Sequence, residues 1–253
     1  MEHAGRHALV TGGGTGIGLD IARALAARGA EVTITGRTLD RLEAAAAGTP
    51  RLHPLAMNVD EEASVRDGIA AAAAARGPVA ICVANAGIAE GAPFRKEKLA
   101  HWRQVMATNL DGAFLTFQAA LATLGREDRG RMIAVSSIAG LAGLKNAIAY
   151  TASKHGVIGL VRGLSEEYMG GGVTFNAVCP GWVETPIVAR NATEIAARQG
   201  ITEDEARALL ARGNRHKALL QTDEVTGAVM WLCSDAARSV NGQSIQIAGG
   251  QVT

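Results

Sequence analysis

Short apolar runs alternate with longer alanine-rich segments from one end of this sequence to the other. Most of the short runs are apolar on both faces, which is typical of parallel strands covered by helices on both sides of a sheet. The regular alternation indicates repeated βαβ units. The sequence therefore predicts an α/β fold, a Rossmann-type doubly wound parallel sheet of about seven strands with helices on both faces. The expected strands are residues 7–11, 31–35, 52–57, 79–84, 131–136, 173–178 and 244–247, and the main expected helices are residues 16–28, 61–76, 98–124 and 149–169.

The chain length sets the domain organisation. The 253 residues suit one domain over residues 1–253 and are too few for two ordinary domains with a linker. Residues 186–217 interrupt the alternation with a polar helical pattern. We expect this segment to be an insertion that covers the substrate as a mobile helical flap, with few of its groups in the core.

Charge and cysteine content exclude several classes of protein. The formal net charge of +1 gives no reason to expect a nucleic acid or an anionic membrane as a partner. Cys82, Cys179 and Cys233 form no CxxC pair, so neither a metal site nor a disulfide framework is predicted. With no apolar signal region at residues 1–6 and no uncharged stretch of about 18 residues, the sequence is interpreted as cytoplasmic.

A glycine-rich turn follows the first expected strand. Residues 11–18 read Thr-Gly-Gly-Gly-Thr-Gly-Ile-Gly and lead into an apolar-periodic helix. Glycines let the backbone approach a pyrophosphate, and the free N–H groups at the start of the helix attract the anion. A plain glycine turn is the simpler interpretation, but its position directly after the first strand favours dinucleotide binding.

The end of the second expected strand bears on the choice of cofactor. A carboxylate at this place would hold the 2′-hydroxyl of NAD, and the sequence has Gly36 and Arg37 there instead. An arginine fork suits a 2′-phosphate, so NADP(H) is favoured and NAD(H) remains the alternative. Arg37 can also be a solvated arginine at a strand end.

Three residues downstream carry acid–base chemistry. Tyr150 and Lys154 are four apart, so they share one face of a helix, and a nearby cation is expected to lower the pKa of the phenol. Ser137 ends the fifth expected strand, at the edge where such sheets bind ligands. A hydroxyl there can hold a carbonyl oxygen against Tyr150. Taken singly, these residues would be a surface pair and a turn residue.

The sequence as a whole resembles the short-chain dehydrogenase/reductase family in its single-domain form. The motifs that carry the resemblance are Thr11-xxx-Gly16-x-Gly18, Asn85-Ala86-Gly87, Asn109, Ser137, Tyr150-xxx-Lys154, and Pro180-Gly181 with Thr185. Within the family the chain is most similar to 3-oxoacyl reductases and 3-hydroxybutyrate dehydrogenases.

The resemblance implies a role for each matching residue. Tyr150 would be the proton donor, Ser137 the anchor of the substrate oxygen, Lys154 the tuner of the tyrosine, and Asn109 the holder of a relay water. Thr15 departs from the family pattern, because many NADP-dependent members have Arg or Lys there, so Arg37 would hold the 2′-phosphate largely alone. The implied cofactor-binding residues are Gly12, Gly14, Thr15, Gly16, Ile17, Gly18, Arg37, Asn58, Val59, Asn85, Gly87, Tyr150, Lys154, Pro180, Gly181, Val183 and Thr185.

The two similar branches of the family differ in how they hold an acid group. In hydroxybutyrate dehydrogenases a Gln, a His and a Lys grip the free carboxylate, and the matching positions here are Ala89, Ala139 and Ala147. A neutral thioester or ketone is therefore the expected substrate. The predicted substrate residues are Ser137, Leu144, Tyr150, Trp182 and Val188, with the packing of Trp182 in the insertion as an equal alternative.

Partner and function hypotheses follow from these residues. The leading one is an NADP(H)-dependent oxidoreductase that interconverts a ketone and a secondary alcohol, with a 3-oxoacyl thioester as the best guess. Alternatives are an NAD-linked hydroxyacid or secondary-alcohol dehydrogenase and a non-catalytic dinucleotide-binding regulator. Arg126, Arg129 and Arg131 could meet coenzyme A or an acyl carrier protein, or form a solvated basic turn. The resemblance implies a homotetramer that pairs the helices at 98–124 and 149–169, with residues 242–252 at a second interface.

Overall fold

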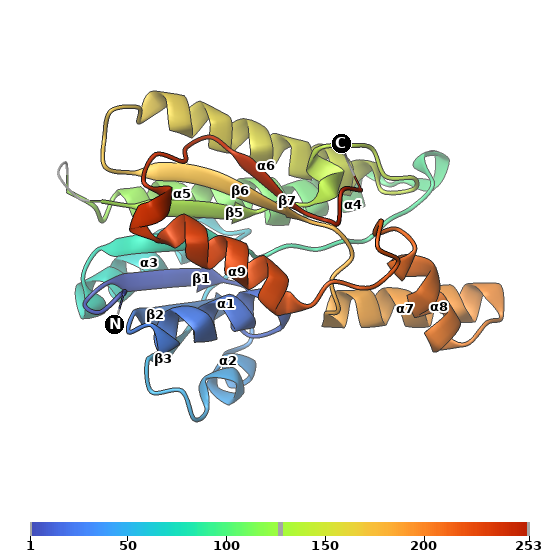
Figure 1. The fold of residues 1–253 in the computed structure, drawn as a ribbon, viewed down its shortest axis with the longest axis horizontal. Coiled ribbons are helices and arrows are strands. Elements are labelled where there is room, and N and C mark those ends of the chain that lie inside the picture. The colour runs from blue at the N-terminus through green and yellow to red at the C-terminus, as the bar shows by residue number, and fades with distance from the viewer. Residues whose placement is uncertain (1, 126–128, 252–253) are drawn as a thin grey trace.

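A computed structural model of the chain describes residues 2–125 and 129–251. One sheet of seven strands, all of them parallel, runs through it in the order β3-β2-β1-β4-β5-β6-β7 (Figure 1). The predicted doubly wound α/β sheet is confirmed, with strand ends that differ from the prediction by at most two residues. The strands are β1 His7–Thr11, β2 Glu31–Gly36, β3 Leu52–Ala56, β4 Val79–Ala84, β5 Arg131–Val135, β6 Thr174–Pro180 and β7 Ser244–Ile247.

The strand order reverses between β1 and β4. The chain builds β2 and β3 on one side of β1, and then crosses over to build β4 to β7 on the other. The loops that follow β1 and β4 therefore diverge, and a crevice opens between them at the carboxyl edge of the sheet. This is where the glycine-rich turn and the segment at Asn85 meet.

Helices cover both faces of the sheet. α1, α2 and α9 pack on one face, where their apolar side chains join those of Ala8 and Val10. α3, α5 and α6 pack on the other, where Leu9 joins the second core cluster (Figure 1). The alternation along β1 explains why this strand reads as apolar on both faces. The helices are α1 Gly16–Ala27, α2 Leu39–Ala46, α3 Glu62–Arg76, α4 Leu99–Met106, α5 Gly112–Leu121, α6 Ile148–Glu167, α7 Pro186–Gln199, α8 Glu203–Ala211 and α9 Thr222–Cys233.

The single helix predicted at residues 98–124 is wrong in one respect. A π-helical segment, Ala107–Asp111, separates α4 from α5. Its i→i+5 hydrogen bonds add one residue to a turn, which apolar periodicity does not reveal. Asn109 lies in this segment, and π-helical turns are frequent at functional sites.

The insertion at residues 186–217 contains α7 and α8, which pack on each other to the right of the sheet in Figure 1. Its apolar side chains form a small cluster of their own, separate from the two clusters on the sheet: Val188, Ala192, Ala196, Ala206 and Leu210. The capping box between Thr202 and Glu205 fixes the start of α8. Small alanines allow this packing in a segment whose charges suggest a solvated surface.

Candidate active site

The glycine-rich turn is built for close approach of the backbone. Gly12 and Gly16 have φ angles of +63° and +54°, which favour glycine. A Cβ on Gly18 would lie 2.5 Å from the carbonyl oxygen of Gly12. Asn85 fastens the turn to β4, because its Nδ2 donates to the carbonyl oxygens of Thr11 at 2.9 Å and Gly12 at 3.3 Å.

The start of α1 has the features of an anion site. Thr15 occupies the N-cap position, and its side chain makes no capping hydrogen bond. The first N–H groups of α1 are therefore available to an anion, and the helix dipole adds a positive end. Together with the glycines this arrangement fits the pyrophosphate of a dinucleotide.

Two arginines lie beside this turn at the end of β2. Arg37 is exposed, and a Cβ on the neighbouring Gly36 would meet only the Leu42 side chain, at 3.5 Å. Arg41, in the first turn of α2, was missed: its Cγ lies 3.7 Å from the place a Cβ would take on Gly14. Its position in the sequence could have indicated it, because Arg41 follows Arg37 by four residues, in the helix that packs next to Gly14.

The other predicted cofactor residues lie on neighbouring loops. The position of a Cβ on Gly16 is 3.4 Å from Cγ2 of Thr185, so the loops after β1 and β6 touch. Thr185 is the N-cap of α7 and accepts a hydrogen bond from the Val188 N–H at 3.4 Å. Asn58 and Val59 follow β3. The side chain of Asn58 donates a hydrogen bond to Glu61 at 2.8 Å, and Val59 is buried.

Ser137, Tyr150 and Lys154 come together between β5 and α6. Ser137 follows β5, and its Oγ accepts from the N–H of Ala139 at 3.1 Å. Tyr150 lies in the first turn of α6 and lines the same cavity as Ser137. Lys154, one turn later, is 4% exposed, and its Nζ donates to the carbonyl oxygen of Val135 at 2.8 Å. The same Nζ is 5.7 Å from the centre of the Tyr150 ring.

The ionisation of this pair differs from the sequence prediction. Burial lowers the pKa of Lys154 to about 8. Burial also raises the pKa of Tyr150, although the side chain of Ser137 acts in the opposite direction. The expected lowering of the tyrosine pKa by the cation is therefore not found, because desolvation of the phenolate outweighs it and Nζ is turned to the Val135 carbonyl.

Asn109 ties the loop after β4 to α6. Its Oδ1 accepts from the N–H of Ile88 at 2.8 Å, and its Nδ2 donates to the carbonyl oxygen of Ile88 and to Oγ of Ser153, both at 3.0 Å. Both amide hydrogens are thus engaged. Gly87 leaves space beside it, since a Cβ there would lie 3.2 Å from Oδ1 of Asn109 and 3.5 Å from Nζ of Lys154.

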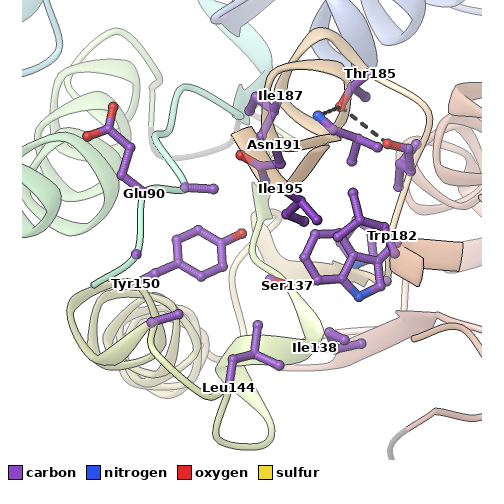
Figure 2. Close-up of a pocket in the computed structure, with 18 of the residues that line it drawn as sticks. Glu90, Ser137, Ile138, Leu144, Tyr150, Trp182, Thr185, Ile187, Asn191 and Ile195 are labelled. Carbon is purple, nitrogen blue, oxygen red and sulfur yellow. Dashed lines mark hydrogen bonds between the residues drawn. The ribbon is translucent and has the colours of Figure 1, made fainter. Parts of the chain in front are cut away.

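A cavity of about 460 Å³ opens beside Ser137 and Tyr150. Figure 2 shows the Tyr150 hydroxyl turned into this cavity and Trp182 on the wall across from it. All five predicted substrate residues line it, together with the cofactor residues Ile17, Pro180, Gly181, Val183 and Thr185. Trp182 also packs against the apolar cluster of the insertion, the other role considered for this residue.

The three alanines are not equivalent in the structure. Ala89 and Ala147 line the cavity, whereas Ala139 is fully buried and is not part of its wall. Sequence reasoning also missed the polar residues at the wall, which come from the loop after β4, the segment before α6, and α7. They are Glu90, Lys145, Asn146, Asn191, Glu194 and Arg198.

The arginines considered for carrier binding lie elsewhere. Arg131 begins β5, whereas Ser137 follows the end of this strand, so the two are at opposite edges of the sheet. Arg131 is also buried and forms no solvated turn. Arg129 shares the distant edge with it, and Arg126 is outside the described residues. In the described ranges, no helix has the length and apolarity to cross a membrane, and no group of His, Cys, Asp and Glu could hold a metal ion.

Comparison with known proteins agrees with this geometry. Residues 6–196 match the family model of the short chain dehydrogenases. The chain is 36% identical to the D-beta-hydroxybutyrate dehydrogenase of Cupriavidus necator over 98% of both chains, and 32% identical to the 3-oxoacyl-(acyl-carrier-protein) reductase of Escherichia coli over 99% of this chain and 98% of the relative. A crystal structure of a variant of actinorhodin polyketide ketoreductase with NADPH matches with a TM-score of 0.93 and 31% identity, over 99% of this chain and 98% of the other.

The chain belongs to the short-chain dehydrogenase/reductase family. It is an NAD(P)-dependent oxidoreductase, as the sequence predicted. Its relatives include both of the branches that the sequence resembled, the hydroxybutyrate dehydrogenases and the 3-oxoacyl reductases.

Proposed function

We propose that this protein reduces a neutral ketone, best a 3-oxoacyl thioester or ester, to a secondary alcohol with NADPH. The observation that carries this proposal is the position of Ser137 and Tyr150 together on the wall of a mainly apolar cavity next to the glycine-rich turn. Apolar walls with few polar groups are typical of sites for small molecules. The complete set of Asn109, Ser137, Tyr150 and Lys154 also argues against a regulator without catalysis.

The residues of the chain divide the work at the substrate carbonyl. Ser137 and Tyr150 hold the carbonyl oxygen, and Tyr150 donates a proton to this oxygen as the alcohol forms. The nicotinamide, when bound, supplies the hydride to the carbonyl carbon. Lys154 places a positive charge near the oxygen that gains negative charge, and Asn109 keeps the loop after β4 against α6. Both side-chain amide hydrogens of Asn109 are engaged, so its side chain has no donor left for a relay water.

The acid role of Tyr150 has a direct test with a matched control. Tyr150→Phe should lower kcat by at least about 100-fold and change the dissociation constant of the cofactor by no more than a few-fold. The only other tyrosine, Tyr168, packs against Phe175 away from the cavity, so Tyr168→Phe should keep near-normal turnover. A Tyr150→Phe enzyme that retains a tenth of the wild-type kcat would remove this residue from the acid role.

We propose a preference for NADPH that rests on Arg37 and Arg41. Both arginines are exposed beside the glycine-rich turn, and no carboxylate stands at position 36 or 37. Two forked cations compensate for Thr15, which cannot pair with a 2′-phosphate as Arg or Lys would.

The kcat/KM values for NADPH and NADH test this preference. Arg37→Ala and Arg41→Ala should each lower kcat/KM for NADPH about ten-fold, or about 1.4 kcal/mol, and leave the value for NADH nearly unchanged. Arg162→Ala, an exposed arginine on α6, is the control. A wild-type enzyme that prefers NADH would contradict the proposal.

The choice of a neutral substrate rests on the cavity wall. Ala89 and Ala147 offer no donor to a carboxylate, and Leu144, Trp182 and Val188 add apolar surface. A β-keto ester or thioester should therefore exceed acetoacetate in kcat/KM by about ten-fold or more. Competition between the two substrates decides the question.

A specific observation keeps the hydroxyacid dehydrogenase as second candidate. Lys145 and Arg198 lie on the same cavity wall, and either cation can meet a carboxylate that enters from the mouth. If acetoacetate and 3-hydroxybutyrate are the better pair, Arg198→Gln should raise their KM, and the NAD-linked alternative would replace the leading one.

We propose a homotetramer in a reducing compartment such as the cytoplasm. Phe114 on α5 is 45% exposed and Trp231 on α9 is 42% exposed. Apolar surface of this kind favours association of subunits. β7 is the open edge of the sheet. Residues 242–251 follow this edge and suit the second interface, whereas Val252 lies outside the described residues.

The three cysteines are buried free thiols, which suits a reducing environment. The chain would act as one domain, with α7 and α8 over the substrate.

A further inference from the structure

A second cavity, of about 280 Å³, lies at the edge of the sheet opposite the candidate active site. β1 and β5 begin there and α9 ends there, far from α7 and α8 in Figure 1. The residues that line it are Glu2, His3, Arg6, Arg129, Arg131, Cys233, Ser234 and Asp235. Nothing in the proposed reaction uses this cavity.

The charges of the described residues around this cavity sum to a positive site. Among residues 2–125 and 129–251, three arginines line it against two carboxylates. Glu2 pairs with Arg28, which lies outside the cavity: Oε2 of Glu2 is 3.6 Å from Nε of Arg28. Asp235 approaches Arg131 only to 3.9 Å, and its side chain is 89% exposed, so water screens most of its charge.

The buried polar groups of this cavity lack partners. His3 is 1% exposed, and neither of its ring nitrogens has a hydrogen-bond partner among residues 2–125 and 129–251. The same holds for Nε of Arg131, a residue that is 4% exposed and whose Nη1 donates to the carbonyl oxygen of Gly130. Buried donors without acceptors cost free energy, which an occupant with several acceptor oxygens would offset.

The carboxyl end of α9 would by itself repel an anion. Arg6 counters this effect, because its Nη1 donates to the carbonyl oxygen of Cys233 at 3.4 Å and its Nη2 to that of Ala80 at 3.3 Å. Arg6 is thus engaged with the backbone. Arg129 and Arg131 keep donors for a ligand, and burial lowers the pKa of His3, so its neutral ring offers one N–H donor.

We propose that this cavity binds a phosphate group. The forked guanidinium groups of Arg129 and Arg131 match the oxygens of a phosphate, and the His3 N–H adds a third donor direction. The volume accommodates a phosphate with part of an organic group or with water, so both inorganic phosphate and a phosphate monoester are candidate sources. Because the cavity is at the far edge of the sheet, binding there does not block the candidate active site.

Calorimetric titration of the NADPH-saturated protein tests the proposal, since the bound cofactor keeps phosphate out of the glycine-rich turn. Inorganic phosphate and glycerol phosphate are titrated separately, at an ionic strength held constant with chloride. Saturable binding of either one near a 1:1 ratio to the chain is expected, and the tighter of the two identifies the source. The absence of saturable binding for both would overturn the proposal and leave a hydrated cavity.

Variants locate the binding. Arg131→Met should weaken phosphate binding at least about ten-fold, and Arg129→Gln at least about three-fold. Arg131 is buried and its loss can impair folding, whereas Arg129 is exposed, so Arg129→Gln keeps the test decisive. Arg66→Gln is the matched control, because Arg66 is an exposed arginine paired with Asp67 on α3. Equal weakening by Arg66→Gln, or none by Arg129→Gln and His3→Phe, would contradict a site in this cavity.

Discussion

Replacement of Gly18 by alanine tests how tightly the glycine-rich turn is closed. Gly18 is buried in the first turn of α1, and an added Cβ would lie 2.5 Å from the carbonyl oxygen of Gly12 and also against Nδ2 of Asn85. The carbonyl belongs to the backbone and cannot turn away as a long side chain could. Either the turn or the Asn85 amide must therefore move.

The expected loss of stability can be worked out from these contacts. Overpacking of a closed site costs about 1–3 kcal/mol. The hydrogen bonds of Asn85 to Thr11 and Gly12 are strained at the same time, at about 1 kcal/mol for one lost bond. Alanine in a helix regains up to about 1 kcal/mol relative to glycine. The balance is a loss of about 1–3 kcal/mol, which for a chain of this size lowers Tm by about 2–12 °C.

Thermal unfolding and cofactor titration measure the two consequences. Gly18→Ala should lower Tm and weaken NADPH binding by ten-fold or more, because the displaced turn no longer presents its N–H groups to the pyrophosphate. Gly163→Ala is the matched control: Gly163 is exposed on α6, and a Cβ there meets nothing within 4 Å. A Gly18→Ala protein with unchanged Tm and unchanged affinity for NADPH would refute the reasoning.

Three further predictions concern acid–base chemistry, the insertion and assembly. If the reaction needs the charged form of Lys154, whose pKa burial lowers to about 8, kcat/KM for ketone reduction should fall as the pH rises through about 8; a flat profile from pH 7 to 9.5 would contradict this. Asn214→Ala should raise the substrate KM several-fold more than it lowers kcat, since Asn214 bonds both the N–H and the carbonyl oxygen of Trp182; steady-state kinetics that show no change in KM would count against it. Phe114→Glu should yield smaller particles by light scattering, and an unchanged mass would remove α5 from the interface.

Much of the fold could be predicted from the sequence, because a parallel strand with two covered faces and an amphipathic helix each leave a local pattern. β1, β4 and β7 begin and end at the predicted residues. The π-helical segment at Ala107–Asp111 could not be predicted this way. It changes hydrogen-bond spacing over a single turn, and the apolar residues on either side of it still fit a continuous helix.

The candidate site shows a different limit. Ser137, Tyr150 and Lys154 are close in the chain, so their meeting follows from one strand and one helix. Arg41 and Asn214 act on residues that lie in other loops, and no local pattern links them to those residues. Their roles depend on how the loop after β1 and the insertion are placed in space.

Burial explains why the charge pattern of the sequence gives wrong predictions at both ends of the strands, for Arg131 and for Tyr150. Arg131 reads as part of a basic turn, yet it begins a central strand and is enclosed, because the neighbouring strands and the end of α9 surround it. The phenol of Tyr150 has a raised pKa for the same reason, since removal from water disfavours the phenolate more than the Ser137 side chain favours it. A donor whose pKa stays above the working range remains protonated until the substrate oxygen takes the proton. The free protein is therefore in the form that reduction of a ketone requires.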